Sequence, residues 1–269
     1  EMYAAQVQYV VMEVSSHALD QGRVEGVDFD TAIFTNLTHD HLDYHGSIEN
    51  YKEAKKLFFK YYIKNSDKKK KVAILNKDDP NMADFLPDPP VARLFFSLSD
   101  NADAQLLNVE EDIDGLSLEI SVMGNRFSVT SPLIGRFNAS NILAACLFGY
   151  TEGISYDAMK KGIESLQGVP GRLERVSNEK GIPIFVDYAH TPDALKKVLE
   201  MLGRLKRGRL NVVFGCGGDR DTAKRPVMGS IASNLTDFTI ITSDNPRSEN
   251  PMKIIEDIKQ GFSGNSYRI

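Results

Sequence analysis

The chain has 269 residues, two cysteines and a formal net charge of −5 at pH 7. This length suits about two domains of roughly 150 residues each, and two distant cysteines do not form a disulfide framework. The acidic balance argues against general binding to nucleic acid or anionic membranes, and no apolar run reaches the ~20 residues that span a bilayer.

Short apolar runs alternate with amphipathic stretches along most of the chain. Runs that are apolar throughout are typical of strands covered on both faces, as in a parallel sheet. The alternation therefore predicts an α/β fold with mostly parallel sheets. The expected strands cover residues 9–14, 31–36, 72–76, 94–98, 182–186, 211–214 and 238–242.

The pattern changes between residues 105 and 133, where polar and apolar residues alternate. This alternation predicts a small antiparallel insertion, with Gly124 and Asn125 at its hairpin turn. Helices are expected from about Asn138 onward and over residues 156–166.

Residues 167–171 read Gln-Gly-Val-Pro-Gly and interrupt the pattern. We therefore expect a first domain over residues 1–168 and a second over 169–269. In the second, Thr191 is expected to N-cap a helix that has Pro192 at its first position.

The stretch Thr-His-Asp-His-Leu-Asp-Tyr-His-Gly at 38–46 has three histidines directly after an expected strand. It resembles the HxHxDH pattern of metallo-β-lactamase-like zinc hydrolases, but Tyr44 shifts His45 by one position. No further histidine occurs between residues 46 and 189 to complete that site. Ordinary hydrogen-bonding loop histidines are the alternative.

Two nearby residues favour a metal site of another kind. Glu13 lies inside the expected strand 9–14, where a buried carboxylate needs a cation. Lys55 falls on the apolar stripe of the next expected helix, which Ser47 N-caps. A buried neutral amine can form a carbamate, an anionic metal ligand, whereas a snorkelling lysine is the alternative. The apolar stripe consists of Ile48, Tyr51, Phe58 and Tyr62.

Eight ordered motifs run through essentially the whole chain. They are Glu-Val-Ser-Ser-His-Ala-Leu at 13–19, Thr-Asn-Leu-Thr-His-Asp-His-Leu-Asp-Tyr-His-Gly at 35–46, Tyr-Lys-Glu-Ala-Lys at 51–55, Gly-Arg-Phe-Asn-Ala-Ser-Asn-Ile-Leu-Ala-Ala at 135–145, Gly-Arg-Leu-Glu at 171–174, Asp-Tyr-Ala-His-Thr-Pro at 187–192, Gly-Cys-Gly-Gly-Asp-Arg-Asp at 215–221 with Lys-Arg-Pro at 224–226, and Asp-Asn-Pro-Arg-Ser-Glu at 244–249. Together they resemble the Mur ligases of peptidoglycan synthesis, and within that family the tripeptide synthetases.

The resemblance implies an ATPase-type central domain and a Rossmann-like C-terminal domain. It implies ATP-dependent amide formation through an acyl phosphate, with two Mg²⁺ sites and a carbamylated lysine. The implied substrates are UDP-N-acetylmuramoyl-L-alanyl-D-glutamate and meso-2,6-diaminopimelate. A monomer in the bacterial cytoplasm, with no nucleic-acid partner and no membrane insertion, is expected.

The resemblance also implies a role for residues that match the family motifs. Glu13, His41 and Lys55, the last as carbamate, are the implied metal ligands and catalytic groups, while the other motif histidines shape the site. Ser15, Gln21 and Arg23 are expected to hold the UDP-muramoyl dipeptide. The nucleotide is expected to meet Asn138, Asn141, Arg172, Asp187 and His190, although Asn138 could instead N-cap a helix and Asp187 could be structural.

The segment Asp244-Asn245-Pro246-Arg247 is expected to select the amino acid. An arginine fork pairs bidentately with a carboxylate, and diaminopimelate carries one carboxylate more than lysine. Arg247, helped by Arg220, should therefore select diaminopimelate. Lysine-adding relatives lack this arginine, and the alternative is a simple turn with a solvated Arg247.

Three family segments are absent from the sequence: the Gly-x-x-Gly-Lys-Thr phosphate loop, the uridine-binding domain and a Gly-Lys-Gly-His-Glu stretch. We therefore expect an internal fragment that is inactive alone. A lysine-adding enzyme, another Mur or folylpolyglutamate-type ligase, or a non-catalytic Mur-like binding module remain alternatives. Gly215-Cys-Gly-Gly lacks the GxGxxG spacing, so an oxidoreductase has little support.

Overall fold

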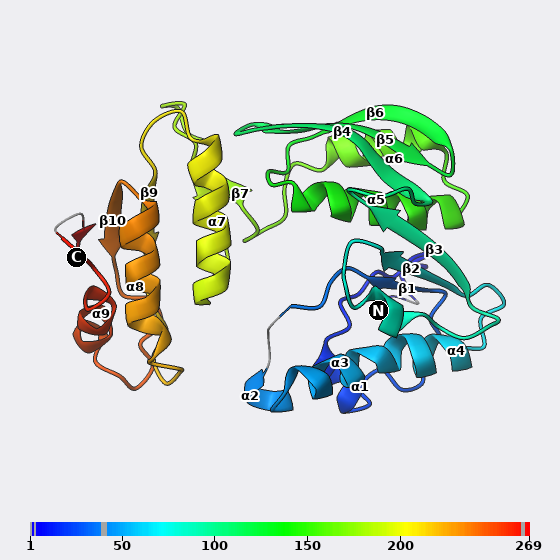
Figure 1. The fold of residues 1–269 in the computed structure, drawn as a ribbon, viewed down its shortest axis with the longest axis horizontal. Helices are drawn as coiled ribbons and strands as arrows, with labels where there is room; N and C mark the ends of the chain where they lie inside the picture. The colour runs from blue at the N-terminus through cyan, green and yellow to red at the C-terminus, as the bar shows by residue number, and fades with distance from the viewer. Residues whose placement is uncertain (1, 3, 39–41, 265–266) are drawn as a thin grey trace. The chain divides into compact units, whose positions relative to one another are not determined.

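A computed structural model describes residue 2 and residues 4–38, 42–264 and 267–269. The chain forms two compact units (Figure 1). Unit 1 comprises residues 1–109, 117–130 and 136–165, and unit 2 comprises residues 110–116, 131–135 and 166–269. The mostly parallel α/β fold expected from the sequence is confirmed.

A six-stranded sheet organises unit 1, in the order β1-β2-β3-β4-β5-β6. The first four strands run parallel. Two-residue turns connect β4 to β5 and β5 to β6, so these strands form antiparallel hairpins. The second turn is Met123-Gly124, where both residues have positive φ as a type I′ turn requires. The strands are β1 (Thr31–Phe34), β2 (Val72–Asn76), β3 (Ala92–Ser97), β4 (Ala104–Asp112), β5 (Gly115–Val122) and β6 (Asn125–Ser131).

The strand predicted at residues 9–14 is wrong, and with it the burial of Glu13. These residues form no helix or strand, Val11 is 83% exposed, and Glu13 is exposed. A continuous apolar run indicates a strand only where neighbours cover it on both sides, and this segment pairs with none of the described strands. Its Tyr9 ring instead makes an edge contact with Phe148 on the helix α5.

Helices cover both faces of the parallel strands in unit 1. On one face, α5 packs against β2 and β3, and its Leu143 and Leu147 are fully buried. On the other, Phe59 and Ile63 pack with Phe34, Leu75 and other residues in one apolar cluster. The helical segments are α1 (Ser16–Asp20), α2 (Leu42–His45), α3 (Ile48–Leu57), the π-helical η1 (Phe58–Tyr62), α4 (Ile63–Asn65), the 3₁₀ turn η2 (Met82–Phe85), α5 (Phe137–Thr151) and α6 (Tyr156–Ser165).

The π-helical turn changes which residues of this helical stretch are buried. Ser47 N-caps α3 as predicted, since its side chain accepts from Asn50 N at 3.1 Å. The sequence placed Phe58 and Tyr62 on a continuous α-helical stripe, but the wider turn rotates Phe59 into the core. Phe58 is only partly buried and packs against both this core and a smaller cluster of Leu19, Val24 and Phe29, whereas Tyr62 packs against the smaller cluster.

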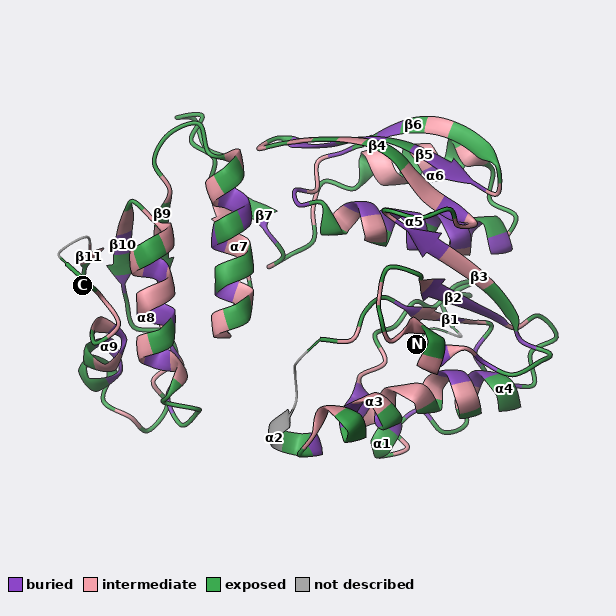
Figure 2. Ribbon diagram, viewed as in Figure 1, coloured by how far each residue is buried: buried purple, intermediate pink, exposed green. Residues whose placement is uncertain are grey.

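Unit 2 contains a parallel sheet in the order β11-β10-β9. Residues of α7, α8 and α9 pack with this sheet, and Figure 2 shows buried residues alternating with exposed ones along α7 and α8. Thr191 N-caps α7 as predicted, accepting from Ala194 N at 3.3 Å. The elements are β7 (Glu174–Arg175), β8 (Phe185–Val186), α7 (Pro192–Leu205), β9 (Asn211–Phe214), α8 (Lys224–Leu235), β10 (Phe238–Ile241), α9 (Pro251–Lys259) and β11 (Tyr267–Arg268).

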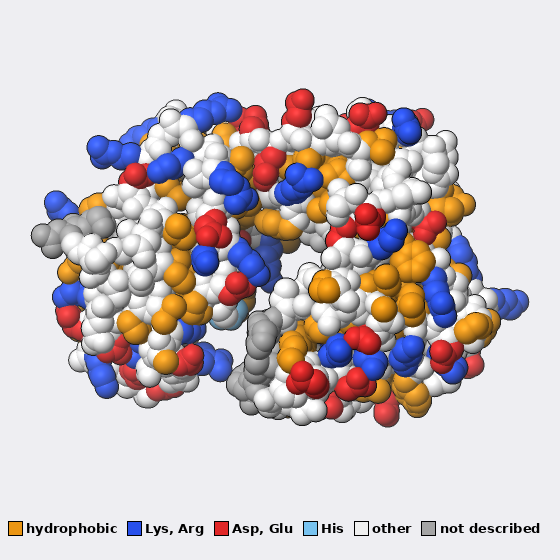
Figure 3. All heavy atoms as spheres, in the orientation of Figure 1, with side chains coloured by type: hydrophobic (Ala, Val, Ile, Leu, Met, Phe, Trp, Pro, Cys, Tyr) orange, Lys and Arg blue, Asp and Glu red, His pale blue; other side chains and the backbone are white. Residues whose placement is uncertain are grey.

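Two of the strand predictions for unit 2 are confirmed, at 211–214 and 238–242. The one at 182–186 shortens to β8, which pairs antiparallel with β7. Within the described ranges, no helix is long and apolar enough to cross a membrane. Figure 3 shows acidic and basic side chains interspersed on the face in view. Some charged side chains of the chain form ion pairs, such as Lys52 with Asp84.

Candidate functional site

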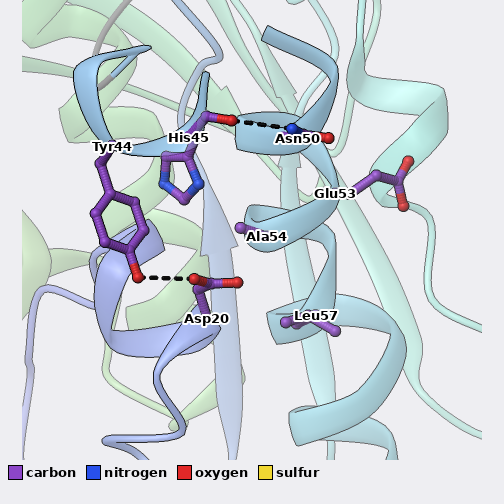
Figure 4. Close-up of a pocket in the computed structure, with 7 residues that line it drawn as sticks. All are labelled: Asp20, Tyr44, His45, Asn50, Glu53, Ala54 and Leu57. Atoms are coloured by element: carbon purple, nitrogen blue, oxygen red, sulfur yellow. Dashed lines mark hydrogen bonds between the residues drawn. The ribbon is translucent and has the colours of Figure 1, made fainter. Parts of the chain in front are cut away.

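Residues expected to hold the muramoyl dipeptide lie on and beside the short helix α1. Ser15 N-caps this helix, because its Oγ accepts from Ala18 N at 3.2 Å. Gln21 follows the helix and donates through Nε2 to the Tyr44 hydroxyl at 2.8 Å. Tyr44 in turn donates to Asp20 Oδ2 at 2.8 Å (Figure 4). Gln21 and the exposed Arg23 therefore sit on a loop that Tyr44 fixes from a distant part of the sequence.

Aromatic contacts join α1 to α2 and α3. The His17 ring lies 4.0 Å from that of Tyr44, and the His45 ring lies 5.4 Å from that of Tyr51, measured between centroids. His45 Nε2 is also 2.9 Å from Ser16 Oγ. His17 and His45 thus connect α1 to the segments that follow it in the sequence.

Lys55 lies at the α3 side of this group. Its Nζ is 5.2 Å from the centroid of the Tyr51 ring, a distance at which a cation–π attraction operates. Lys55 is half-buried, so the prediction of a lysine in the core is wrong in that respect. The buried position next to it belongs to Ala54, because the stripe that faces the core runs through Tyr51, Ala54 and then the π-helical turn.

A cavity of about 580 Å³ opens beside this group of side chains (Figure 4). Polar and apolar groups both line it, and two of the lining residues, Asp20 and Glu53, carry carboxylates. Its lining consists of Asp20, Tyr44, His45, Asn50, Glu53, Ala54 and Leu57.

Of the three predicted metal ligands, Glu13 and Lys55 belong to the described residues. Carboxylate oxygen suits Mg²⁺, but Glu13 is exposed, and Lys55 becomes a ligand only as a carbamate. His39 and His41 lie outside the described residues. In the part of the chain that the structure describes, no group of three or more His, Cys, Asp or Glu residues could hold a metal ion.

Two of the residues expected at the nucleotide lie near the start of α5. Asn141 Nδ2 donates to Asn138 Oδ1 at 3.1 Å. The helix begins at Phe137 with Arg136 at its N-cap position, so Asn138 does not cap it. The two amides therefore form a side-chain pair at the start of the helix.

The three others expected at the nucleotide come together in unit 2. Asp187 joins two segments, because its Oδ2 accepts from Leu173 N and its Oδ1 accepts from Ala189 N, each at 2.9 Å. The Arg172 guanidinium lies 5.5 Å from the ring centroid of Tyr188, whose carbonyl oxygen is 3.0 Å from His190 Nδ1. Asp187 thus holds the backbone of two segments, and the side chains of Arg172 and His190 near it are exposed.

The residues expected to select the amino acid lie on two loops at the carboxyl ends of β9 and β10. Ligands of parallel α/β sheets commonly bind at such strand ends. Gly218 N donates to Asn245 O at 2.9 Å, and Arg247 Nη1 donates to Gly218 O at 3.0 Å. Arg247 has a φ of 48°, and its side chain remains exposed. Arg220, Asp244 and Asn245 are also exposed on these loops.

The two loops approach so closely that glycine is required at their contact. A Cβ added to Gly218 would lie 1.9 Å from Pro246 O. Ser248 donates from its Oγ and from its backbone N to the carboxylate of Asp219, at 2.7 and 3.1 Å. The segments 217–221 and 244–249 therefore form one joined unit, which we call the paired strand-end loops.

Two contributors to these sites had no role in the sequence predictions. Tyr44 is within a quoted motif, but its contact with Gln21 spans 23 residues and no local pattern reveals it. Arg225, in the Lys-Arg-Pro motif, is completely buried beneath the paired strand-end loops. The sequence signal available for the burial of Arg225 was its position between a Gly-rich segment and an apolar one.

Comparison with known proteins defines the class of this α/β protein. Residues 1–149 match the Mur ligase middle domain, and residues 171–269 match the Mur ligase, glutamate ligase domain. The chain belongs to the Mur ligase family.

Within the family, its relatives include UDP-N-acetylmuramoyl-L-alanyl-D-glutamate--2,6-diaminopimelate ligases. That of Halalkalibacterium halodurans is 46% identical over 267 residues, covering 99% of this chain and 54% of the relative. That of Geobacter metallireducens is 48% identical over 256 residues, covering 95% and 50%. The chain thus spans about half the length of the curated relatives that it matches.

Solved structures give the same fold. A UDP-N-acetylmuramoyl-L-alanyl-D-glutamate--2,6-diaminopimelate ligase matches with a TM-score of 0.66 and 38% identity, over 95% of this chain and 52% of that one. Folylpolyglutamate synthase of Mycobacterium tuberculosis matches with a TM-score of 0.69 but only 20% identity, over 90% and 54%, which supports the shared fold alone.

Proposed function

We propose that this chain carries the central and C-terminal domains, residues 1–168 and 169–269, of an ATP-dependent amide ligase. The ligase adds meso-2,6-diaminopimelate to UDP-N-acetylmuramoyl-L-alanyl-D-glutamate in peptidoglycan synthesis. Relatives of 46% and 48% identity that bear this activity in their names support the proposal. The observation that carries it is the exposed Arg247, anchored at a strand end by Gly218.

The proposed reaction has two steps. The terminal carboxylate of the D-glutamyl residue takes the γ-phosphoryl group of ATP, giving an acyl phosphate and ADP. The diaminopimelate amine then attacks the carbonyl carbon, and the tetrahedral intermediate expels phosphate as the amide forms and the amine loses its proton. Ser15, Gln21 and Arg23 would hold the acceptor substrate.

ATP and Mg²⁺ are the proposed cofactors, and magnesium would supply charge neutralisation at the phosphates. Glu13, His41 and a carbamylated Lys55 remain the proposed ligands of two metal sites. Asn138, Asn141, Arg172, Asp187 and His190 are proposed at the nucleotide. A monomeric, cytoplasmic enzyme belongs to the same proposal.

Selectivity for diaminopimelate follows from the chemistry of the anchored arginine. Its link to Gly218 uses one Nη1–H, and the remaining exposed part of the guanidinium can pair with a carboxylate. Lysine ends in an ammonium, which gains nothing from this fork and is repelled by Arg247 and Arg220. Asp244 and Asn245, also exposed, would receive the amino group at the same end.

The test is Arg247→Ala in the complete protein encoded by the gene that carries this sequence. The exposed Arg204 on α7 provides a matched control, Arg204→Ala. Loss of a charge-assisted pair worth about 1.5–3 kcal/mol lowers kcat/KM for diaminopimelate by ~10–150-fold, and the preference over lysine should fall accordingly. If Arg247→Ala prefers diaminopimelate over lysine as strongly as Arg204→Ala does, the assignment of Arg247 as the selecting residue is contradicted.

A further inference from the structure

Arg225 is the most unusual charged residue in unit 2. It lies in the first turn of α8, and its relative exposure is 0%. An unpaired buried charge is strongly destabilising, so buried guanidinium groups occur where several acceptors surround them. The identity of those acceptors indicates what the arginine does.

Glu249 is the principal partner of Arg225. Arg225 Nη2 donates to Glu249 Oε1 at 2.7 Å, and Nη1 donates to Oε2 at 2.9 Å, which makes a bidentate pair. Arg225 Nη1 also donates to Asp257 Oδ2 on α9 at 2.9 Å. The hydrogen bonds from Arg225 and from the backbone of Asp219 lower the pKa of Glu249 to about 2, so its carboxylate is ionised near neutral pH.

Glu249 also holds the paired strand-end loops. Its Oε1 accepts from Asp219 N at 2.6 Å, and its own backbone N donates to Pro246 O at 2.9 Å. One carboxylate therefore connects the buried guanidinium to both loops. Arg220 follows Asp219 directly, and Arg247 lies two positions before Glu249, so both proposed substrate-binding arginines are next to these anchors.

Asp257 differs from Glu249 in its relation to the paired strand-end loops. It pairs with the same guanidinium from α9, but among the described residues its carboxylate accepts no hydrogen bond from either loop. Glu249 accepts two hydrogen bonds from the guanidinium and Asp257 accepts one. The extra bond of Glu249 to Asp219 N makes them different, and this difference can be measured.

We propose that Arg225 and Glu249 are positioning residues for diaminopimelate specificity, which fix the paired strand-end loops so that Arg247 and Arg220 meet the distal carboxylate together. This inference rests on the proposed function and adds to it two residues that need not touch the substrate. Arginine is required because one planar group reaches Glu249, Asp257 and, at 3.5 Å, Gly217 O, which a lysine ammonium cannot do with the same geometry.

The test compares Glu249→Gln with the matched control Asp257→Asn in the complete protein. Both variants remove one carboxylate charge from Arg225 and keep the side-chain shape. We expect Glu249→Gln to raise KM for diaminopimelate by about tenfold, with KM for ATP unchanged within about twofold. Asp257→Asn should leave both values within about twofold while lowering Tm.

Hydrogen exchange of the Asp219 and Ser248 amides gives a readout that does not depend on turnover. Protection of both should fall in Glu249→Gln and persist in Asp257→Asn. Arg225→Lys should reproduce the KM effect of Glu249→Gln if it folds. Equal behaviour of the two carboxylate variants, in KM or in exchange, overturns the positioning role. Failure of the unmodified protein to use diaminopimelate would instead reject the proposed function, with the exchange result still reporting whether Glu249 anchors the loops.

Discussion

Replacing Gly218 with alanine should disturb the amino-acid site through the backbone alone. The new Cβ would lie 1.9 Å from Pro246 O and 2.6 Å from Pro246 C. A relaxed C···O contact needs about 3.3 Å, so the two loops would have to separate by roughly 1.4 Å. Neither contact atom belongs to a flexible side chain, because both are backbone.

The expected cost has two parts. Forced overpacking of this kind destabilises a protein by about 1–3 kcal/mol. A shift of about 1 Å in a substrate-positioning group can lower activity ~100-fold, and Arg247 moves with the loop because it donates to Gly218 O at 3.0 Å. We therefore expect kcat/KM for diaminopimelate to fall by about two orders of magnitude.

Gly217→Ala is the matched control, because a Cβ there would meet its nearest atom, Asn245 O, at an ordinary 3.7 Å. Steady-state kinetics with diaminopimelate and urea unfolding should be measured for both variants in the complete protein. The reasoning is refuted if Gly218→Ala retains the kcat/KM and unfolding free energy of the Gly217→Ala control.

Three further predictions follow from burial and charge. Phe85 is fully buried, and its ring stacks on that of Phe34 at 4.0 Å between centroids. Phe85→Ala should therefore lower the unfolding free energy by about 3–5 kcal/mol in urea titrations. If Phe85→Ala costs as little as the control Tyr61→Ala, at an exposed position, the assignment of Phe85 to the core is contradicted. The pKa of Glu249 is lowered to about 2 in the folded protein. The stabilisation that its ionised carboxylate contributes is therefore present above the unfolded-state pKa of about 4.3, and it is lost as the pH falls toward the folded-state pKa. Stability measured between pH 6 and pH 2 should fall less steeply in Glu249→Gln, and identical slopes would count against the pairing. Burial raises the pKa of the Cys146 thiol to about 12, so iodoacetamide at pH 8 should label Cys146 only when the protein is unfolded in urea. Labelling of Cys146 in the folded protein would contradict its burial.

Much of the fold could be predicted because it depends on local chemistry. Thr191 and Ser47 are N-caps in the structure, as their positions before amphipathic runs indicated. The strands at 72–76 and 211–214 have the predicted bounds, because each is a short run of β-branched and apolar residues between turns. Such signals lie within a few neighbouring residues.

The errors arose where distant parts of the chain decide the outcome. The run at 9–14 is apolar enough for a strand, but pairing requires a neighbouring strand that local sequence cannot supply. The π-helical turn moved the buried face from Phe58 to Phe59, although helical periodicity suited the former.

The candidate site shows the same division between local and distant determinants. The motifs identified Gln21 and Arg247, while the partners that fix them, Tyr44 and Gly218, became evident only from the fold. The burial of Arg225 likewise depends on three segments that meet in space.

The most direct test of the proposed activity is phosphate release by the complete protein, measured with ATP, UDP-N-acetylmuramoyl-L-alanyl-D-glutamate and either meso-2,6-diaminopimelate or lysine. We predict release that requires all three substrates and is at least about tenfold faster with diaminopimelate, as expected for one additional charge-assisted pair. Equal rates with lysine, or release without an amino acid, would contradict the assignment of Arg247 and the paired strand-end loops as the selecting site.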